Sequence, residues 1–194
     1  MEHSMKDMLR KKVAPLLVAL AAVAALLFGS AMAANAATAN ADTKAKACQN
    51  NDSLDRREKV VCIARSQLGV RERGTTKRAA NNCQKYFRDF GSKLNCDDDV
   101  KGPWCAAFTR WVWTKAGVPN TPKSFLVSNW AAALTRVRTP KPGDVAVASS
   151  GQHIEIVVWV NGKTIHTIDG NGGNNSVAKG SHRKGAMTYY RMGS

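Results

Sequence analysis

The feature that most constrains the fold is a change in hydrophobic periodicity at about Pro140. Before it, apolar side chains recur at three- and four-residue spacing, which is typical of helices. After it, they alternate, as in strands that bury one face. Helices followed by an antiparallel sheet predict an α+β fold with its site between the two halves. We expect helices at 55–68, 81–90, 103–116 and 124–134, strands at 145–147, 153–160, 163–169 and 187–191, and a Gly/Asn-rich loop at 170–180.

The N-terminal 33 residues have the layout of an export signal. Four basic residues precede an apolar run at 13–28, and small residues at 31–36 offer a cleavage site. The run is shorter than the roughly 20 residues of a membrane-spanning helix. We therefore expect a signal peptide at 1–33, a disordered leader at 34–47 and one domain at 48–194, with no membrane span after cleavage; an uncleaved anchor is the alternative.

The exported protein is strongly basic. Residues 1–33 hold four basic and two acidic residues, so their removal lowers the formal charge from +15 to +13. Such a charge outside the cell predicts a polyanionic partner, which cell-wall polymers, anionic lipid surfaces or extracellular nucleic acid would all provide.

The cysteine count leaves one thiol over. In an oxidising compartment five cysteines form two disulfides and one free thiol. We favour Cys48 with Cys62 and Cys83 with Cys96, because each pair closes a short loop, and this leaves Cys105 free. A disulfide between Cys96 and Cys105 would contradict the prediction that Cys105 is a free thiol.

Cys105 falls in the first turn of a predicted helix. Pro103 is a suitable entry residue, and Gly117 a left-handed stop. The unpaired N–H groups and the positive dipole end at a helix start favour a thiolate, the attacking form of the thiol. A small buried core residue is the alternative reading. The acidic run 97–99 matches no complete calcium loop, so we interpret it as a solvated turn and expect no metal.

Three blocks in order resemble the CHAP family of cysteine amidohydrolases and peptidases, related to the NlpC/P60 and papain-like group. The resemblance spans about residues 57–171 and implies a papain-like cysteine hydrolase architecture. The blocks are PWCAAFTRWVWTKAGV at 103–118, KPGDVAV at 141–147 with QHIEIVV at 152–158, and IDGN at 168–171.

The resemblance also implies roles for single residues. Cys105 would be the nucleophile and His153 the general base. The family commonly has an acidic residue followed two positions later by Asn, and Asp169 and Asn171 stand at those places. Glu155, on the predicted strand face of His153, is the rival for orienting the base.

Two residues next to the nucleophile and the base, and two further histidines, are expected to have different roles. Trp104 and Gln152 adjoin the nucleophile and the base, so they are the expected substrate contacts; the family commonly has Gly where Gln152 stands. His166 falls on the opposite strand face from Asp169 and is expected to be a packing or surface residue. His182 is expected in a solvated loop.

Hairpin register decides whether the acid can reach the base. A tight turn at 161–162 would put Asp169 on the wrong face of its strand. A three-residue loop with a bulge, pairing Val160 with Thr164, brings Asp169 opposite Glu155 and Asn171 opposite the histidine. We therefore predict the bulged turn.

By resemblance, the function is a secreted or wall-located hydrolase that cleaves peptidoglycan amide bonds through an acyl-enzyme, with no cofactor. Peptidoglycan and anionic wall polymers are the expected partners, and no dedicated nucleic-acid partner is expected. One alternative is a cysteine peptidase that acts on other amides. Another is a catalytically silent module that binds anionic wall polymer or nucleic acid through basic residues, namely Arg71, Arg73, Lys77, Arg78, Lys179, Arg183 and Lys184.

Overall fold

The computed structural model describes residues 36–72, 84–88, 90 and 104–193. The chain divides into two units, Met1–Ala39 and Asn40–Ser194, and the site lies within the second. Cys83, Cys96 and the acidic run 97–99 lie outside the described residues. Within the described ranges, no helix has the length and apolarity needed to cross a membrane.

The helices form where apolar spacing and capping residues predict them. Helix α2 begins with a complete capping box: Asp55 accepts from the Glu58 amide, and the Glu58 carboxylate accepts from the Asp55 amide, both at 2.8 Å. Gly117 has φ +70 directly after α4, as a left-handed stop requires. The described helices are α2 (Arg56–Ser66), α3 (Lys85–Arg88), α4 (Cys105–Lys115) and α5 (Val127–Ala133).

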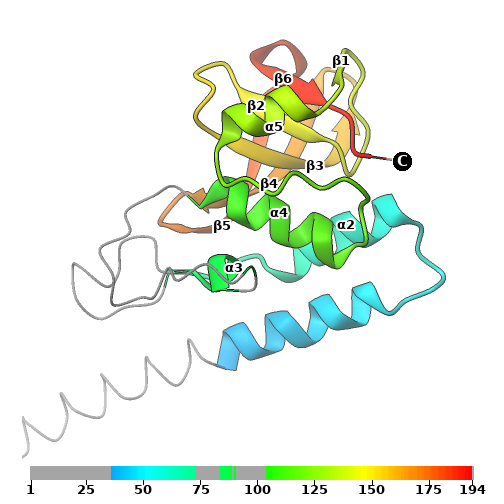
Figure 1. The fold of residues 1–194 in the computed structure, drawn as a ribbon, viewed down its shortest axis with the longest axis vertical. Coiled ribbons are helices and arrows are strands. Elements are labelled where there is room, and N and C mark those ends of the chain that lie inside the picture. Colours follow the sequence, from blue (N-terminus) through cyan, green and yellow to red (C-terminus); the bar gives the residue numbers. More distant parts are fainter. Residues whose placement is uncertain (1–35, 73–83, 89, 91–103, 194) are drawn as a thin grey trace, which may run out of the picture. The chain divides into compact units, whose positions relative to one another are not determined.

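The C-terminal half forms a six-stranded antiparallel sheet in the order β1-β6-β2-β3-β4-β5. Helices α2 and α4 pack against its central strands, so the α+β prediction is confirmed (Figure 1). The strands are β1 (Arg136–Val137), β2 (Val145–Ala148), β3 (Ile154–Asn161), β4 (Thr164–Gly172), β5 (Ser176–Arg183) and β6 (Met187–Tyr190), with a 3-10 turn, Lys184–Ala186, before β6.

The predicted alternation along β3 separates two apolar clusters. Ile154 and Ile156 belong to the larger cluster, which contains the helices. Val157 belongs to a smaller cluster with Ile165 and Tyr189. The sheet therefore buries both faces, and polar groups on the second face are also shielded from water.

A helix replaces part of the expected leader. Residues 40–49 are helical, and Ala41, Ala45 and Cys48 are buried in the main core. Their spacing puts three small side chains on one helix face, which permits close packing. The Cys48–Cys62 disulfide, which was predicted, ties this helix to α2. The prediction of disorder is therefore wrong for residues 40–47.

The predicted Gly/Asn-rich loop at 170–180 is also mostly wrong. Strand β4 continues to Gly172, and β5 already starts at Ser176. Only a short turn separates them, in which Asn174 and Asn175 have φ of +61° and +51°. Asn tolerates this left-handed conformation, so the composition marked a tight turn rather than a long loop.

Neither of the two turns considered for the β3–β4 hairpin is observed. Asn161 pairs with Thr164, which leaves Gly162 and Lys163 as a two-residue turn. The three-residue loop predicted at this position is therefore wrong. Gly162 has φ +57°, which satisfies the turn without steric cost.

A bulge within β3 restores the register that the site needs. Val158 is the extra residue, and beyond it Ile156 pairs with Ile168. This offset is the one predicted, and its continuation brings Asp169 level with Glu155. The register toward the site was thus predicted correctly, although the bulge lies inside the strand rather than at the turn.

Candidate active site

Cys105 is the first residue of α4 and a free thiol. It is buried, with 1% of its surface exposed, and its Sγ lies 4.0 Å from the Gln152 carbonyl oxygen. The first N–H groups of a helix have no intrahelical acceptor and carry the positive end of the dipole. The thiol therefore lies where negative charge on sulfur is stabilised.

Gly170 allows α4 to approach β4 closely. A Cβ at this position would lie 2.5 Å from the Phe108 Cβ and 2.5 Å from the Trp104 ring. Only a residue without a side chain permits that contact, which positions the acid at 169 near the helix start. The glycine of the IDGN block is explained by this packing.

The His153 ring joins the sheet to the thiol. Its Nε2 lies 2.8 Å from Asp169 Oδ2, and the nearby Cys105 thiol is a second group that raises the pKa of the ring. Because Nε2 is engaged by the carboxylate, Nδ1 is the nitrogen left for the thiol. Asp169 is 5% exposed, which shields this hydrogen bond from water.

These contacts favour the charged imidazolium. The hydrogen bond that the ring donates to Asp169 is the main cause that raises the pKa of His153 from its ordinary 6.5 to about 10; Cys105 adds to the rise, and partial burial acts in the opposite direction. At neutral pH the ring is therefore protonated. An imidazolium beside a thiol favours the reactive sulfur anion and holds a proton ready for a leaving group.

Glu155 is a second buried acid behind the histidine. Its Oε1 lies 3.8 Å from His153 Nε2, beyond hydrogen-bond range. Its Oε2 accepts a hydrogen bond from Thr167 and lies 2.8 Å from His182 Nε2. Asp169, and not Glu155, is thus the direct partner of the base.

The sequence did not place His182 correctly. The residue lies in β5 and contacts Glu155, whereas a solvated loop was expected. The error follows from reading 170–180 as a loop, which hid the start of the strand. The alternation of side chains after the Asn174–Asn175 turn was the signal that could have revealed this strand.

Asn171 does not share the role of the acid. It has φ +61°, at an irregularity in the β4–β5 pairing between Asp169 and Gly172. Among the described residues, no hydrogen bond joins it to His153. Gln152 has an exposed side chain next to the base, which leaves it accessible to a substrate, while its backbone carbonyl faces Cys105.

Trp104 is a core residue. It is fully buried, its Nε1 donates to Glu72 Oε1 at 2.7 Å, and its ring stacks on Tyr86 at 5.7 Å. Its side chain offers no exposed surface for the substrate contact that the sequence predicted. His166 lies outside the site, as expected, and stacks on Trp159.

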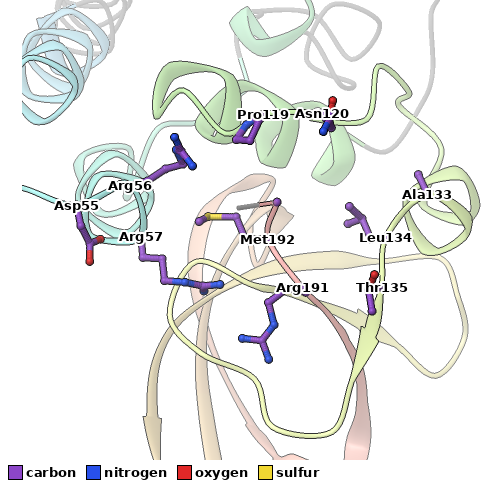
Figure 2. Close-up of a pocket in the computed structure, with 11 residues that line it drawn as sticks. Asp55, Arg56, Arg57, Pro119, Asn120, Ala133, Leu134, Thr135, Arg191 and Met192 are labelled. Atoms are coloured by element: carbon purple, nitrogen blue, oxygen red, sulfur yellow. The ribbon is translucent and has the colours of Figure 1, made fainter.

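A pocket of about 580 Å³ lies elsewhere in the domain (Figure 2). It is lined by the start of α2, the segment between α5 and β1, and the C-terminal residues, and contains neither the thiol nor the base. Beside it, Arg57 and Arg191 both contact the buried carboxylate of Asp144. This pocket is separate from the candidate active site.

Comparison with known families places the site within one of them. The family model described as the CHAP domain matches residues 97–171, a shorter range than the 57–171 of the sequence resemblance. The match includes Cys105, His153 and Asp169. No curated protein and no solved structure gave a significant match. Residues 97–171 of this chain thus match the CHAP domain, a type of domain that generally acts as a cysteine- and histidine-dependent amidohydrolase or peptidase.

Proposed function

We propose that this protein is a secreted peptidoglycan hydrolase that cleaves amide bonds with Cys105 as its nucleophile. The observation that supports this proposal is the free Cys105 thiol at a helix start, beside a histidine whose pKa is raised by its hydrogen bond to Asp169. Nucleophile, proton carrier and orienting acid are the three parts that covalent amide hydrolysis needs.

The proposed chemistry has two steps. The Cys105 thiolate attacks the amide carbonyl carbon, and the C–N bond breaks as the His153 imidazolium gives its proton to the leaving amine. A thioester remains. Neutral His153 then takes a proton from a water molecule, whose oxygen attacks the thioester; the C–S bond breaks, and a carboxylic acid is released while the Cys105 thiolate and the His153 imidazolium are restored.

The first N–H groups of α4 are suited to stabilise the oxyanion in both steps. One such donor contributes roughly 3 kcal/mol to transition-state stabilisation in comparable sites. Asp169 keeps the ring oriented while its proton moves, since its hydrogen bond holds Nε2 at 2.8 Å.

The substrate and location are inferred from sequence. An N-terminal signal-like segment directs the protein out of the cell, and a formal charge of +15 in the full chain attracts it to polyanions. The bacterial wall combines anionic polymers with amide cross-links. Wall peptides are therefore the amide substrate that best fits both properties.

The test is release of fragments from purified cell walls by the mature protein and its Cys105→Ala variant. We expect soluble fragments from the wild type and none from the variant, and fragment masses that identify the cleaved bond. Cleavage of casein but not of walls would instead favour a peptidase for other amides. Salt-sensitive wall binding by both proteins without any release would favour the silent binding module.

A further inference from the structure

A groove runs along α2 beside strands β3, β4 and β5, and its lining contains neither the thiol nor the base. It consists of two hollows of about 620 and 310 Å³, which share Arg65 and Val158 in their linings. We call it the α2 groove. Because the hollows adjoin, the groove is suited to a chain-like ligand rather than to one small molecule.

Trp159 forms an aromatic wall of the α2 groove. It is 52% exposed, whereas the other described tryptophans, Trp104, Trp111, Trp113 and Trp130, are at most 4% exposed. Its ring stacks on His166 at 4.7 Å with an interplanar angle of 18°. The bulge at Val158 precedes it, and bulges commonly redirect the following side chain. The ring is thus held in place and left open to solvent.

The charge around Trp159 is positive. Arg65 and Lys179 line the same hollow, and neither makes an ion pair with any residue that the structure describes. The lining of this hollow contains no carboxylate. A fixed aromatic ring between two such cations favours a ligand that combines a ring with negative charge.

We propose that the α2 groove binds an anionic glycan chain, with a sugar ring against Trp159 and carboxylates at Arg65 and Lys179. The C–H face of a sugar packs on an indole ring, and carboxylates pair with a guanidinium or an ammonium. This inference rests on the proposed function, since wall glycan from which the stem peptides are missing carries the free carboxylates of muramic acid along a sugar backbone. Single exposed apolar residues are common, so the paired cations and the adjoining hollows carry the argument.

The groove lies away from the reacting bond. His153 directly precedes β3, and Trp159 lies six residues further along the chain, which corresponds to a separation of at most about 20 Å. A chain held there would leave the thiol free to act on a neighbouring part of the polymer. The α2 groove would therefore anchor the wall while the active site cuts it.

The test measures binding of glycan strands stripped of their stem peptides, so that each muramic acid bears a free carboxylate. The mature wild type can be used, because these strands lack the amide that it would cleave. We expect Trp159→Ala to weaken the dissociation constant at least about 10-fold. Leu126→Ala, the control, removes an apolar side chain that is 64% exposed and lines neither hollow, and should change binding less than about 2-fold.

Further measurements test whether charge and the sugar ring both contribute to binding. Arg65→Gln with Lys179→Gln should weaken binding about 5-fold and reduce its salt dependence. A neutral chitin oligosaccharide should bind more weakly than the anionic strands. An unchanged thermal unfolding midpoint for Trp159→Ala would show that the variant is folded.

Two results would overturn the inference. One is equal binding by the wild type and Trp159→Ala. The other is tighter, Trp159-dependent binding of single-stranded DNA, which would assign the groove to nucleic acid. If the wild type cleaves walls while Trp159→Ala binds strands normally, only this inference fails. If strands bind through Trp159 but no wall is cleaved, only the proposed function fails.

Discussion

Two buried aspartates in this domain hold cationic side chains, but their surroundings differ. Asp144 is fully buried and has four partners: the side chains of Arg57 and Arg191 and the backbone amides of Lys141 and Met192. Both of its oxygens are occupied. Asp144 thus links α2 and the C-terminal residues to the start of β2, beside the pocket of Figure 2.

Asp169 has one cationic partner at hydrogen-bond distance, and that partner has a second contact. His153 reaches Asp169 through Nε2 and Cys105 on its other side. Asp144, whose two carboxylate oxygens both have partners, stabilises the fold. Asp169 instead favours the charged form of the His153 ring, which lies beside the nucleophile. The contrast predicts that substitutions at the two aspartates affect different properties.

The largest effect is expected for Asp169→Asn. The amide keeps the shape of the side chain but removes the charge that holds His153 protonated, so kcat/KM for wall fragments should fall about 100-fold or more. The alkaline limit of activity should also move to lower pH. Release kinetics across pH measure both; an unchanged rate would contradict the assigned role.

Asp144→Asn should have the opposite profile. It leaves two arginines without their charge partner, which should lower the free energy of unfolding by about 3 kcal/mol. Activity per folded molecule should remain near that of the wild type. Urea unfolding combined with the same release assay gives both values, and a loss of activity without a loss of stability would break the comparison.

Gly170→Ala should disturb the link between the two halves of the site. The new methyl group would clash with Phe108 and the ring of Trp104, at a cost of about 1–3 kcal/mol in unfolding free energy. Gly173→Ala is the matched control, because a Cβ there meets nothing within 4 Å. Equal unfolding midpoints for both variants would argue against the close packing of α4 on β4.

Glu155→Gln should have a smaller effect on catalysis. The acid lies 3.8 Å from His153 and acts on it only indirectly, so kcat/KM should fall about 5-fold, in proportion to one weakened interaction of about 1 kcal/mol. Leu126→Ala, which changes an exposed side chain outside the site, is the control. A loss as large as that of Asp169→Asn would make Glu155 the orienting acid.

A separate effect is expected on the pH dependence of stability. The folded protein binds the His153 proton more tightly than the unfolded chain does, because the pKa is raised from 6.5 to about 10. This stabilisation is fully present below pH 6.5 and is lost as the pH rises through about 10. Unfolding midpoints of the wild type and Asp169→Asn should therefore converge toward high pH.

Local signals in the sequence predicted much of the site. The capping box of α2 and the helix start at Cys105 depend on neighbouring residues, and both were predicted correctly. The register that brings Asp169 to His153 was predicted as the condition for the two residues to meet, and the structure achieves it with a bulge inside β3. These features depend on residues that are close together in the chain, and a sequence pattern describes interactions of that kind.

Features that depend on packing were missed. Trp104 is buried because β4 approaches it at Gly170, and the sequence contains no local sign of that contact. The helix at 40–49 buries only small side chains, and the Cys48–Cys62 bond ties it to α2, so its buried face was not recognised as part of the core. His182 reaches Glu155 only through the pairing of β5 with β4.

The most direct test of the central claim is an NMR titration of the His153 imidazole in the mature protein, assigned by comparison with His153→Gln. We predict a transition near pH 10 in the wild type and a lower one in Asp169→Asn, because the carboxylate is the main cause of the raised pKa. A wild-type transition near the ordinary 6.5, unchanged in the variant, would contradict the claim that Asp169 keeps His153 charged beside Cys105.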